Sequence, residues 1–243
     1  KEYGLEKTCD PQNPINMDDG LADKFWQAGF ELAIDTGFYC LNTRRIIKFT
    51  EEEIKNVLKE SLSEVTLGLG KDIRTLKTRK PEDKNVPLFR SGFGPVSEDV
   101  YIPLVQGLAQ YQIIDFVEPL NLTTIYGREL KTSTPYEIIA GHREAVMAKE
   151  ALNKAGRPGN SFLGVVSSSP SEYGQLGGYG TPGGYEPRKD VGIALSITDL
   201  KTSYALLHKV AQIVLNCGGI LFGGHWSMIG GYTGPPEGAA IMA

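Results

Sequence analysis

The sequence predicts an α/β fold: a (β/α)8 TIM barrel behind an N-terminal extension, with about the first half of the barrel present in this chain. Beyond residue 85, short apolar segments alternate with helical ones, which requires parallel strands with helices outside the sheet. The predicted strands end in Gly, Ser or acidic residues. The long segment before the first strand and the lack of a dinucleotide-binding glycine fingerprint favour the barrel over a doubly wound sheet.

Residues 1–84 are predicted to form helices and a short β-ribbon. The stretch 17–37 places apolar residues at helical spacing after acidic residues that suit a helix N-terminus. Thr50 followed by three glutamates is a capping-box signature for a second helix, which is expected to end near Glu64. Residues 65–80 alternate like a pair of strands. Their GLG predicts a tight turn, because neither a P-loop nor a GxGxxG spacing follows.

Residues 85–243 contain the alternating elements of the half barrel. We expect strands at 86–92, 113–119, 161–168 and 220–224, and either a strand or a packed loop at 191–197. We expect helices at 97–111 with Ser97 as cap, at 134–156 between Thr134-Pro135 and Gly156, and at 198–219 with Thr198 as cap. The final PPEGAAIMA is typical of the start of a Pro-initiated helix, so the chain is expected to be truncated.

Composition narrows the class of protein. The 243 residues are 41% hydrophobic and 22% charged with a net charge of −4, which argues against nucleic acid as a partner. The basic run at 74–80 is expected to be a solvated strand face. Cys9, Cys40 and Cys217 are far apart and odd in number, which fits reduced thiols. No zinc-ligand spacing, signal-peptide pattern or apolar window of membrane length is present, so a cytoplasmic protein without metal or membrane is expected.

The loop at 167–184 follows the third predicted strand and is rich in Gly, Ser, Pro and Tyr. In both candidate architectures, ligands bind at the carboxyl ends of the strands. The loop is therefore expected to belong to the site, with glycines that allow close backbone approach. The alternative is a disordered loop.

Several strand-end residues offer chemistry. Glu118 fits a base or a partner for a cation, or a structural carboxylate. His225 is the best acid–base candidate of the three histidines, since His142 and His208 fall in the middle of helices. No GxSxG elbow surrounds the serines. An aromatic wall, or a set of loop anchors, is expected from Tyr173, Tyr179, Tyr185, Trp226 and Tyr232. These residues alone indicate a barrel enzyme that acts on a small molecule, but they do not indicate which reaction it catalyses.

Six stretches carry a more specific resemblance: residues 25–54, LGLGKDIRTLKTRK (67–80), GPVSEDVYIPL (94–104), TPYEIIAGHREA (134–145), KAGRPG (154–159) and IGGYTG (229–234). In this order they resemble the monomethylamine methyltransferases of methanogenic archaea and their bacterial relatives. The resemblance implies an oligomeric (β/α)8 barrel that continues beyond residue 243. It also implies transfer of a methyl group from a methylated amine to the cobalt(I) of a separate corrinoid protein, with no cofactor bound directly.

The chain departs from that family at its reactive residue. The family carries pyrrolysine, whose ring imine captures the amine, four residues after AGRPG and near the end of the third strand. That position is Leu163 here, which cannot act in this way, and the family's flanking acidic residues fall near Ile193 and Gly224. The resemblance then implies a quaternary amine donor, since a quaternary nitrogen leaves as a neutral amine without capture.

Under that hypothesis, Glu118 and aromatic side chains hold the cation and His225 orients a polar group. The expected substrate-binding residues are Ser167, Tyr173, Gly224, Trp226 and Tyr232. A different class is a non-catalytic paralogue that binds the corrinoid protein. An unrelated aldolase- or dehydratase-like barrel would need a Schiff-base lysine or metal carboxylates at strand ends, and neither is evident in this half.

Overall fold

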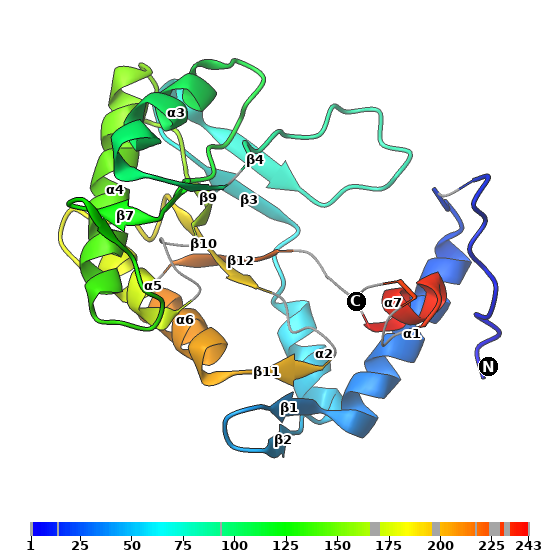
Figure 1. Ribbon diagram of the computed structural model, residues 1–243. Helices are drawn as coiled ribbons and strands as arrows, with labels where there is room; N and C mark the ends of the chain where they lie inside the picture. Colours follow the sequence, from blue (N-terminus) through cyan, green and yellow to red (C-terminus); the bar gives the residue numbers. More distant parts are fainter. Residues whose placement is uncertain are drawn as a thin grey trace.

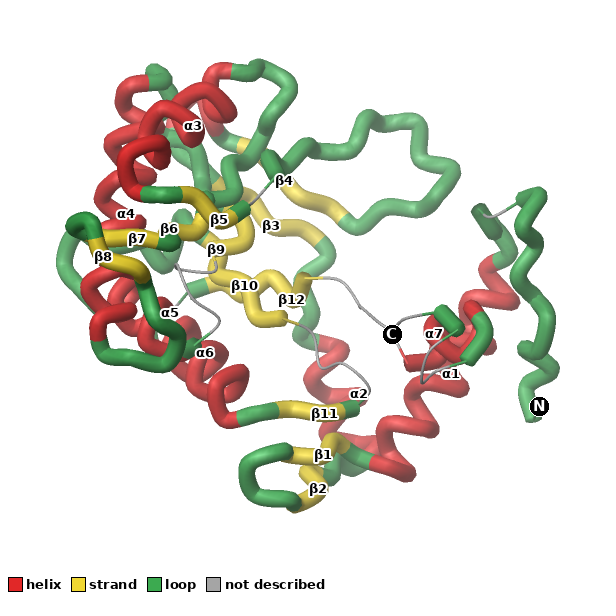
Figure 2. Tube along the Cα trace, viewed as in Figure 1, coloured by secondary structure: helices red, strands yellow, loops and turns green. Residues whose placement is uncertain are grey.

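Five consecutive parts of the chain pair in parallel in the computed structural model, and the last three of them are the strands β9, β10 and β12 (Figures 1 and 2). Arg90 bridges Phe116, Val117 bridges Phe162, β9 (Leu163–Val165) pairs with β10 (Val191–Leu195), and β10 pairs with β12 (Gly219–Gly223). The spatial order of the strands is therefore their order in the sequence. The structure describes residues 2–13, 15–92, 94–165, 171–195, 200–216, 218–223, 229–230 and 234–242, with only the backbone of 195 and 220–223.

The helices between these strands form a row along one side of the sheet (Figure 1). They are α3 (Glu98–Gln110), α4 (Tyr136–Lys154), α5 (Glu172–Tyr179) and α6 (Tyr204–Leu215), and each packs against the next. Parallel strands need such crossover helices. The main apolar core lies between this row and the sheet, where Val117, Phe162 and Val165 pack against residues of α3 and α4. The predicted α/β alternation is confirmed.

The opposite face of the sheet carries a second, smaller core. Phe116, Leu163 and Val191 pack there against Leu67 of β3 (Glu64–Leu67), with partly buried side chains of β4 (Arg74–Lys77) beside them. Strands β3 and β4 form the predicted antiparallel pair, joined by η1 (Gly70–Asp72). Side chains alternate between the faces of a strand, so Phe116 and Val117 fall in different cores. We call this second face, away from the helix row, the inner face.

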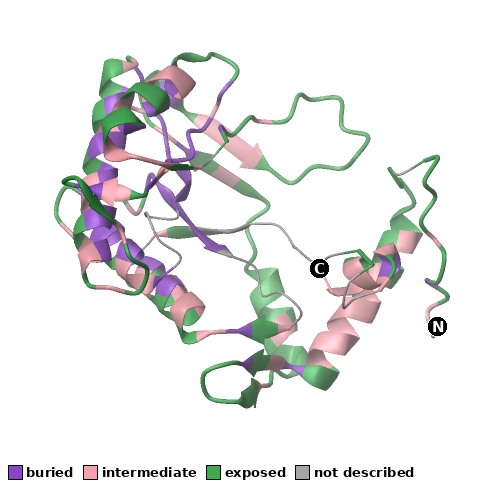
Figure 3. Ribbon diagram, viewed as in Figure 1, coloured by how far each residue is buried: buried purple, intermediate pink, exposed green. Residues whose placement is uncertain are grey.

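The remaining N-terminal elements join the rest of the chain at two places. Strand β1 (Phe38–Cys40) pairs with β2 (Arg45–Ile47) on one side and with β11 (Lys201–Thr202) on the other. Helix α1 (Asp19–Thr36) packs against α7 (Pro236–Met242), the helix predicted at the end of the chain. Neither α1 nor α2 (Glu51–Lys59) has a buried residue, in contrast to the helix row (Figure 3).

Short strands complete the connections between the main elements. They are β5 (Pro95–Val96), parallel to β6 (Asn121–Leu122), and the hairpin of β7 (Thr124–Ile125) and β8 (Arg128–Glu129). The strand expected at 86–92 is limited to the bridge at Arg90. The prediction of a solvated strand face at 74–80 is confirmed only in part: Lys77 and Lys80 are exposed and pair with carboxylates, whereas Arg74 is half-buried and pairs with Asp115. Within the described residues, no helix is both long and apolar enough to cross a membrane.

Two helix boundaries differ from those expected. The capping box at Thr50 is present, but α2 ends at Lys59, because Glu60 and Ser61 close tighter i→i−3 turns before β3 begins. The helix expected from residue 198 begins at Tyr204. Residues 201–202 pair with β1 instead, and the Ser203 side chain accepts a hydrogen bond from the backbone N–H of Leu206. The predicted cap Thr198 lies outside the described residues.

The expectation of a pliable loop at 167–184 is wrong for residues 172–179, which form α5. The glycines here do allow close approach, but between helices. A Cβ on Gly141 of α4 would lie 2.1 Å from the carbonyl oxygen of Gly174, and a Cβ on Gly177 would lie 1.9 Å from that of Ile138. The composition that suggested a ligand loop therefore serves the packing of α4 against α5.

Candidate functional site

A bulge in β9 shapes the inner face of the sheet. Leu163 pairs with Val191, but the next pair joins Val165 to Gly192, so Gly164 is an extra residue on its strand. Gly164 has φ of +93°, a conformation that favours glycine. A Cβ at Gly164 would lie 2.5 Å from Nη1 of Arg90 and 3.3 Å from Oε1 of Glu118. The glycine thus leaves the space that these two charged side chains fill.

Arg90 and Glu118 form an ion pair at this bulge. Nε of Arg90 lies 3.2 Å from Oε2 of Glu118, and the Arg90 side chain is 34% exposed while that of Glu118 is 2% exposed. The backbone N–H of Glu118 donates to Oγ of Ser91 over 2.8 Å, which joins the two neighbouring segments. Oε2 of Glu118 is buried without a hydrogen bond of good geometry. The guanidinium is therefore the accessible part of the pair.

The electrostatics of the pair are set by burial. Burial raises the pKa of Glu118 to about 7, and the positive charge of Arg90 opposes this increase without cancelling it. A carboxyl group that titrates near neutral pH suits proton transfer, and such groups are frequent at functional sites. Glu118 directly follows the β-bridges at Phe116 and Val117, and the structure adds the arginine that accompanies it.

Leu163 is the first residue of β9, and its side chain is 7% exposed within the smaller core. Residues 166–170, which follow β9, lie outside the described residues. Ile193, near which a flanking acidic residue of the family was expected to fall, is also buried, in β10. Ser167, Gly224, His225, Trp226 and Tyr232 lie outside the described residues.

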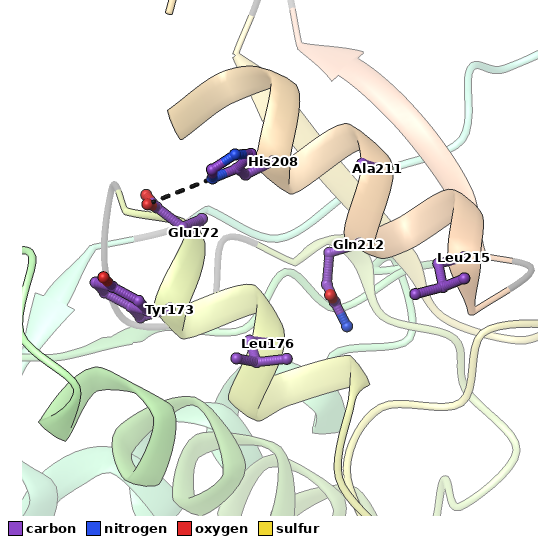
Figure 4. Close-up of a pocket in the computed structure, with 7 residues that line it drawn as sticks. All are labelled: Glu172, Tyr173, Leu176, His208, Ala211, Gln212 and Leu215. Carbon is purple, nitrogen blue, oxygen red and sulfur yellow. Dashed lines mark ion pairs between the residues drawn. The ribbon is translucent and has the colours of Figure 1, made fainter. Parts of the chain in front are cut away.

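The described tyrosines of the expected aromatic wall lie elsewhere. Tyr179 and Tyr185 are buried in the main core, with ring centroids 5.5 Å apart, and so anchor the loop after α5. Tyr173 lines a groove of about 280 Å³ between α5 and α6, and Glu118 is not among the residues that line it (Figure 4). The groove is lined by Glu172, Tyr173, Leu176, His208, Ala211, Gln212 and Leu215. Nδ1 of His208 lies 3.6 Å from Oε1 of Glu172 in this groove.

A second polar cluster between α4, α5 and α6 has no counterpart in the sequence analysis. Lys209 of α6 is buried, and burial lowers its pKa to about 8 against the opposing effect of Glu137 and Glu172. The hydroxyl of Ser171 donates to the carboxylate of Glu137. Lys209 lies four residues before the buried Ile213, and thus on the same face of α6. In the sequence, a lysine on the apolar face of a predicted helix was the feature that could have indicated its burial. This polar cluster connects α4, α5 and α6 with one another.

The described residues contain no group of three or more His, Cys, Asp or Glu side chains placed to hold a metal ion. The inner face instead offers one arginine that can bind an anion and one carboxyl group that can exchange a proton. The sequence pattern alone assigned no role to Arg90. An isolated glycine within a strand pattern, Gly164, was the available signal for the bulge that places it.

Comparisons with known proteins agree on one family. A family model described as "Monomethylamine methyltransferase MtmB" matches residues 1–243. Monomethylamine methyltransferase MtmB1 of Methanosarcina acetivorans is 35% identical over 156 residues, which cover 63% of this chain and 34% of that protein. Monomethylamine methyltransferase MtmB of Methanosarcina mazei is 33% identical over the same shares of the two chains.

Solved structures give the same result. The crystal structure of the Methanosarcina barkeri monomethylamine methyltransferase (MtmB) superposes with a TM-score of 0.88 and 29% identity, over 99% of this chain and 52% of that one. The crystal structure of a hydroxylamine MtmB complex gives the same values. The chain thus spans about a third of the length of the curated relatives that it matches and about half of the solved chains.

Proposed function

We propose a function from the premise that this chain belongs to the monomethylamine methyltransferase MtmB family, whose model matches it throughout. The protein that carries the chain is a methyltransferase that moves a methyl group from a methylated amine to the cobalt(I) of a corrinoid protein. The match over residues 1–243 is the observation that carries this proposal, and the TM-score of 0.88 to an MtmB crystal structure supports it.

The architecture that we propose for the whole protein is a (β/α)8 barrel. The five parallel segments follow one another in sequence order, and their helices lie on one side of the sheet. A doubly wound sheet reverses its strand order and carries helices on both faces. The arrangement of this chain is that of consecutive β/α units of a barrel, whose active sites lie at the carboxyl ends of the strands.

Within this scaffold, Arg90 and Glu118 mark the inner face that would carry the donor. Glu118 lies two residues beyond Phe116 along the same segment, and thus further toward its carboxyl end than the smaller core. The charged pair therefore lies between that core and the end of the sheet where barrel enzymes bind substrate. His225, Trp226 and Tyr232 remain proposed contributors from the segment after β12.

The donor class that we propose is a quaternary amine. The described residues provide no electrophile for capturing an amine on the inner face, and Leu163 is part of the core. A quaternary ammonium needs no capture: its N–CH3 bond breaks, the electron pair stays on nitrogen, and a neutral amine leaves. The methyl group is accepted by cobalt(I), which is a substrate carried by the partner. We place this reaction in the cytoplasm and in a homo-oligomer.

The test uses the full protein with its corrinoid protein reduced to cobalt(I). Absorbance changes report formation of methylcobalt across a panel of mono-, di-, tri- and quaternary methylamines. We expect transfer from a quaternary donor. Transfer from monomethylamine alone would contradict the donor class, because it would show capture without a pyrrolysine at residue 163. Absence of transfer from every donor, with cobalt(I) shown to be present, would contradict the proposed reaction.

The second candidate is a non-catalytic subunit that binds the corrinoid protein. The observation that favours it is the burial of Leu163 among Leu67, Phe116 and Val191, which leaves a core residue at the position that we propose to match the family's pyrrolysine. It predicts that the protein binds the corrinoid protein in a sedimentation experiment but gives no methyl transfer from any donor in the panel.

A further inference from the structure

We infer that Gln175 of α5 is a positioning residue for the Arg90–Glu118 pair, although α5 lies on the opposite side of the sheet from that pair. The Gln175 side chain holds the carboxyl end of β9 in the bulged register that leaves space for the pair on the inner face. This role rests on the proposed function, since it concerns the same site. It assigns Gln175 no contact with the donor, with cobalt or with the corrinoid.

A side-chain hydrogen bond joins α5 to the end of β9. Nε2 of Gln175 donates to the carbonyl oxygen of Val165 over 2.8 Å. Val165 is the last residue of β9 and directly follows the extra residue Gly164. A bulge interrupts the regular ladder of backbone hydrogen bonds. The Gln175 amide therefore supplies a hydrogen bond at the point where the ladder is irregular.

Gln175 is an unfavourable residue to bury at this place. Its side chain is fully buried, and within the described residues its Oε1 has no hydrogen-bond partner. An apolar side chain of similar length would fill the same space without leaving a buried acceptor unsatisfied. The bond from Nε2 to Val165 is what the amide contributes and an apolar side chain could not.

Helix α5 is a fixed support for this bond. Its backbone lies against α4, because a Cβ on Gly141 would lie 2.1 Å from the carbonyl oxygen of Gly174, the residue before Gln175. One turn further along α5, the hydroxyl of Tyr179 donates over 3.3 Å to the carbonyl oxygen of Asp190, directly before β10. Gln175 thus reaches β9 from a helix whose position is set by its other contacts, so it can determine where the end of β9 lies.

The bulge determines which face of the sheet the side chains occupy. Leu163 lies in the smaller core on the inner face, whereas Val165 lies in the main core under the helix row. In a regular strand, residues two apart lie on the same face, so Val165 would join Leu163 on the inner face. Its isopropyl group would then extend toward the space that Nη1 of Arg90 and Oε1 of Glu118 occupy beside the bulge. Loss of the bulge is therefore expected to displace the pair.

The titration of Glu118 reports this displacement. Nε of Arg90 lies 3.2 Å from Oε2 of Glu118. Burial raises the pKa of Glu118 to about 7, and the positive charge of Arg90 opposes this increase. If the guanidinium moves away, its opposing effect is lost while the carboxyl group stays buried. The midpoint of the Glu118 titration should then move upward.

The experiment follows the Glu118 carboxyl carbon by NMR from about pH 5 to 9, on the protein without donor or corrinoid protein. The signal is identified by its absence in Glu118→Gln, and we expect a wild-type midpoint of about 7. Gln175→Met keeps the length of the side chain and removes the donor, so it should move the midpoint upward by about one pH unit. Gln175→Asn, which is too short to reach Val165, should give the same shift and replaces the methionine variant if that variant does not fold.

Two further variants separate positioning from a general loosening of α5. Tyr179→Phe removes the other hydrogen bond from the same helix to a strand connection, so it should lower stability but leave the Glu118 midpoint unchanged. Gly164→Ala disturbs the bulge directly, because its Cβ would lie 2.5 Å from Nη1 of Arg90, and should move the midpoint in the same direction as Gln175→Met. Combining Gln175→Met with Gly164→Ala should add little to either shift, since both act through one bulge.

Three results would overturn the inference. A folded Gln175→Met protein with the wild-type midpoint would show that β9 keeps its register without the amide. An equal shift in Tyr179→Phe would assign both side chains the structural role of holding α5. Additive shifts in the double variant would show that Gln175 does not act through the bulge at Gly164.

The titration also separates this inference from the proposed reaction, because it needs neither donor nor corrinoid protein. If the wild-type protein methylates cobalt(I), the pH profile of kcat in Gln175→Met should move together with the Glu118 midpoint. An unchanged pH profile despite a moved midpoint would contradict a role of Gln175 in the reaction. If the wild-type protein uses no donor, the proposed reaction fails, and the titration still decides whether Gln175 positions the pair.

Discussion

At the scale of single residues, Glu118 combines a predictable position with an unpredictable environment. A short apolar segment followed by an acidic residue predicts that Glu118 lies at the sheet, and the structure places it directly after the β-bridges at Phe116 and Val117. Its partner could not be found in this way, because Arg90 and Glu118 belong to different segments and meet only through strand pairing. The space for the guanidinium depends on a bulge at Gly164, which interrupts an otherwise regular strand pattern.

Glu118 should make the stability of the protein depend on pH. Its pKa is about 7 in the folded chain, against about 4.3 for an unperturbed Glu, so the folded state keeps a proton that the unfolded state releases between these values. This contribution is fully present below about pH 4.3 and is lost as pH rises through about 7. The free energy of unfolding should fall by about 4 kcal/mol across this window through Glu118 alone.

Glu118→Gln should remove this part of the pH dependence, because the amide does not titrate. Urea unfolding at intervals from pH 4.5 to 8, on wild type and variant, gives the difference directly and cancels the other ionisable groups. Parallel curves for the two proteins would show that Glu118 titrates alike in the folded and unfolded states. A difference that grows with pH in favour of wild type would reverse the sign, which would mean that Arg90 dominates over burial.

At the scale of elements, hydrophobic periodicity predicted where most helices and strands lie. The composition of residues 167–184, in contrast, led to a wrong prediction for residues 172–179. Helices α1, α3, α4 and α7 lie where helical spacing, Pro and Gly placed them. Helix α5 was missed because five of its eight residues are Gly or Tyr, and Gly is a poor helix former. What stabilises it is tertiary: glycines of α4 and α5 let the two backbones meet. Sequence alone shows the glycines but not the helix that faces them.

This packing predicts opposite effects for two glycine substitutions. Gly141→Ala places a Cβ 2.1 Å from the carbonyl oxygen of Gly174, so the helices must separate, and we expect a loss of about 1–3 kcal/mol of stability. Gly107→Ala in α3 is the matched control. No atom lies within 4 Å of its added Cβ, so the gain in helix propensity should stabilise the protein by about 0.5–1 kcal/mol.

Thermal and urea unfolding of the two variants against wild type measure these effects. Equal stabilisation by both alanines would show that α4 and α5 are not in close backbone contact. Destabilisation by both would indicate that Gly107 faces a neighbour after all, and the comparison would then fail as a test of packing.

At the scale of the whole molecule, two of the motifs that carry the family resemblance meet each other. LGLGKD at 67–72 and AGRPG at 155–159 are far apart in sequence. In the structure, the N–H of Leu69 donates to the carbonyl of Gly159, and Nε of Arg157 lies 3.0 Å from Oδ1 of Asp72. AGRPG lies a few residues before the amino end of β9, and LGLGKD contacts it there. The sequence presented these motifs without showing that they form one structural unit.

Arg157 joins three parts of the molecule. Besides Asp72 in the β3–β4 connection, its Nη1 donates to the carbonyl oxygens of Ala109 at the end of α3 and of Ile114 before the second strand segment. Arg157 and Asp72 have side-chain exposures of 8% and 6%, so both charges are removed from water. Loss of one member leaves the other charge buried without compensation, which is more costly than loss of an exposed pair.

Asp72→Ala should therefore lower the free energy of unfolding by about 3–5 kcal/mol, as measured by urea denaturation. The same hairpin provides the matched control: Glu64 and Lys77 form a pair with side-chain exposures of 51% and 64%, so Glu64→Ala should cost less than about 1 kcal/mol. Combining Asp72→Ala with Arg157→Met removes both charges and should recover part of the loss. Similar small effects of Asp72→Ala and Glu64→Ala would mean that the hairpin is held by its apolar contacts with Phe116 and Leu163, and that the shared motifs do not act through their charges.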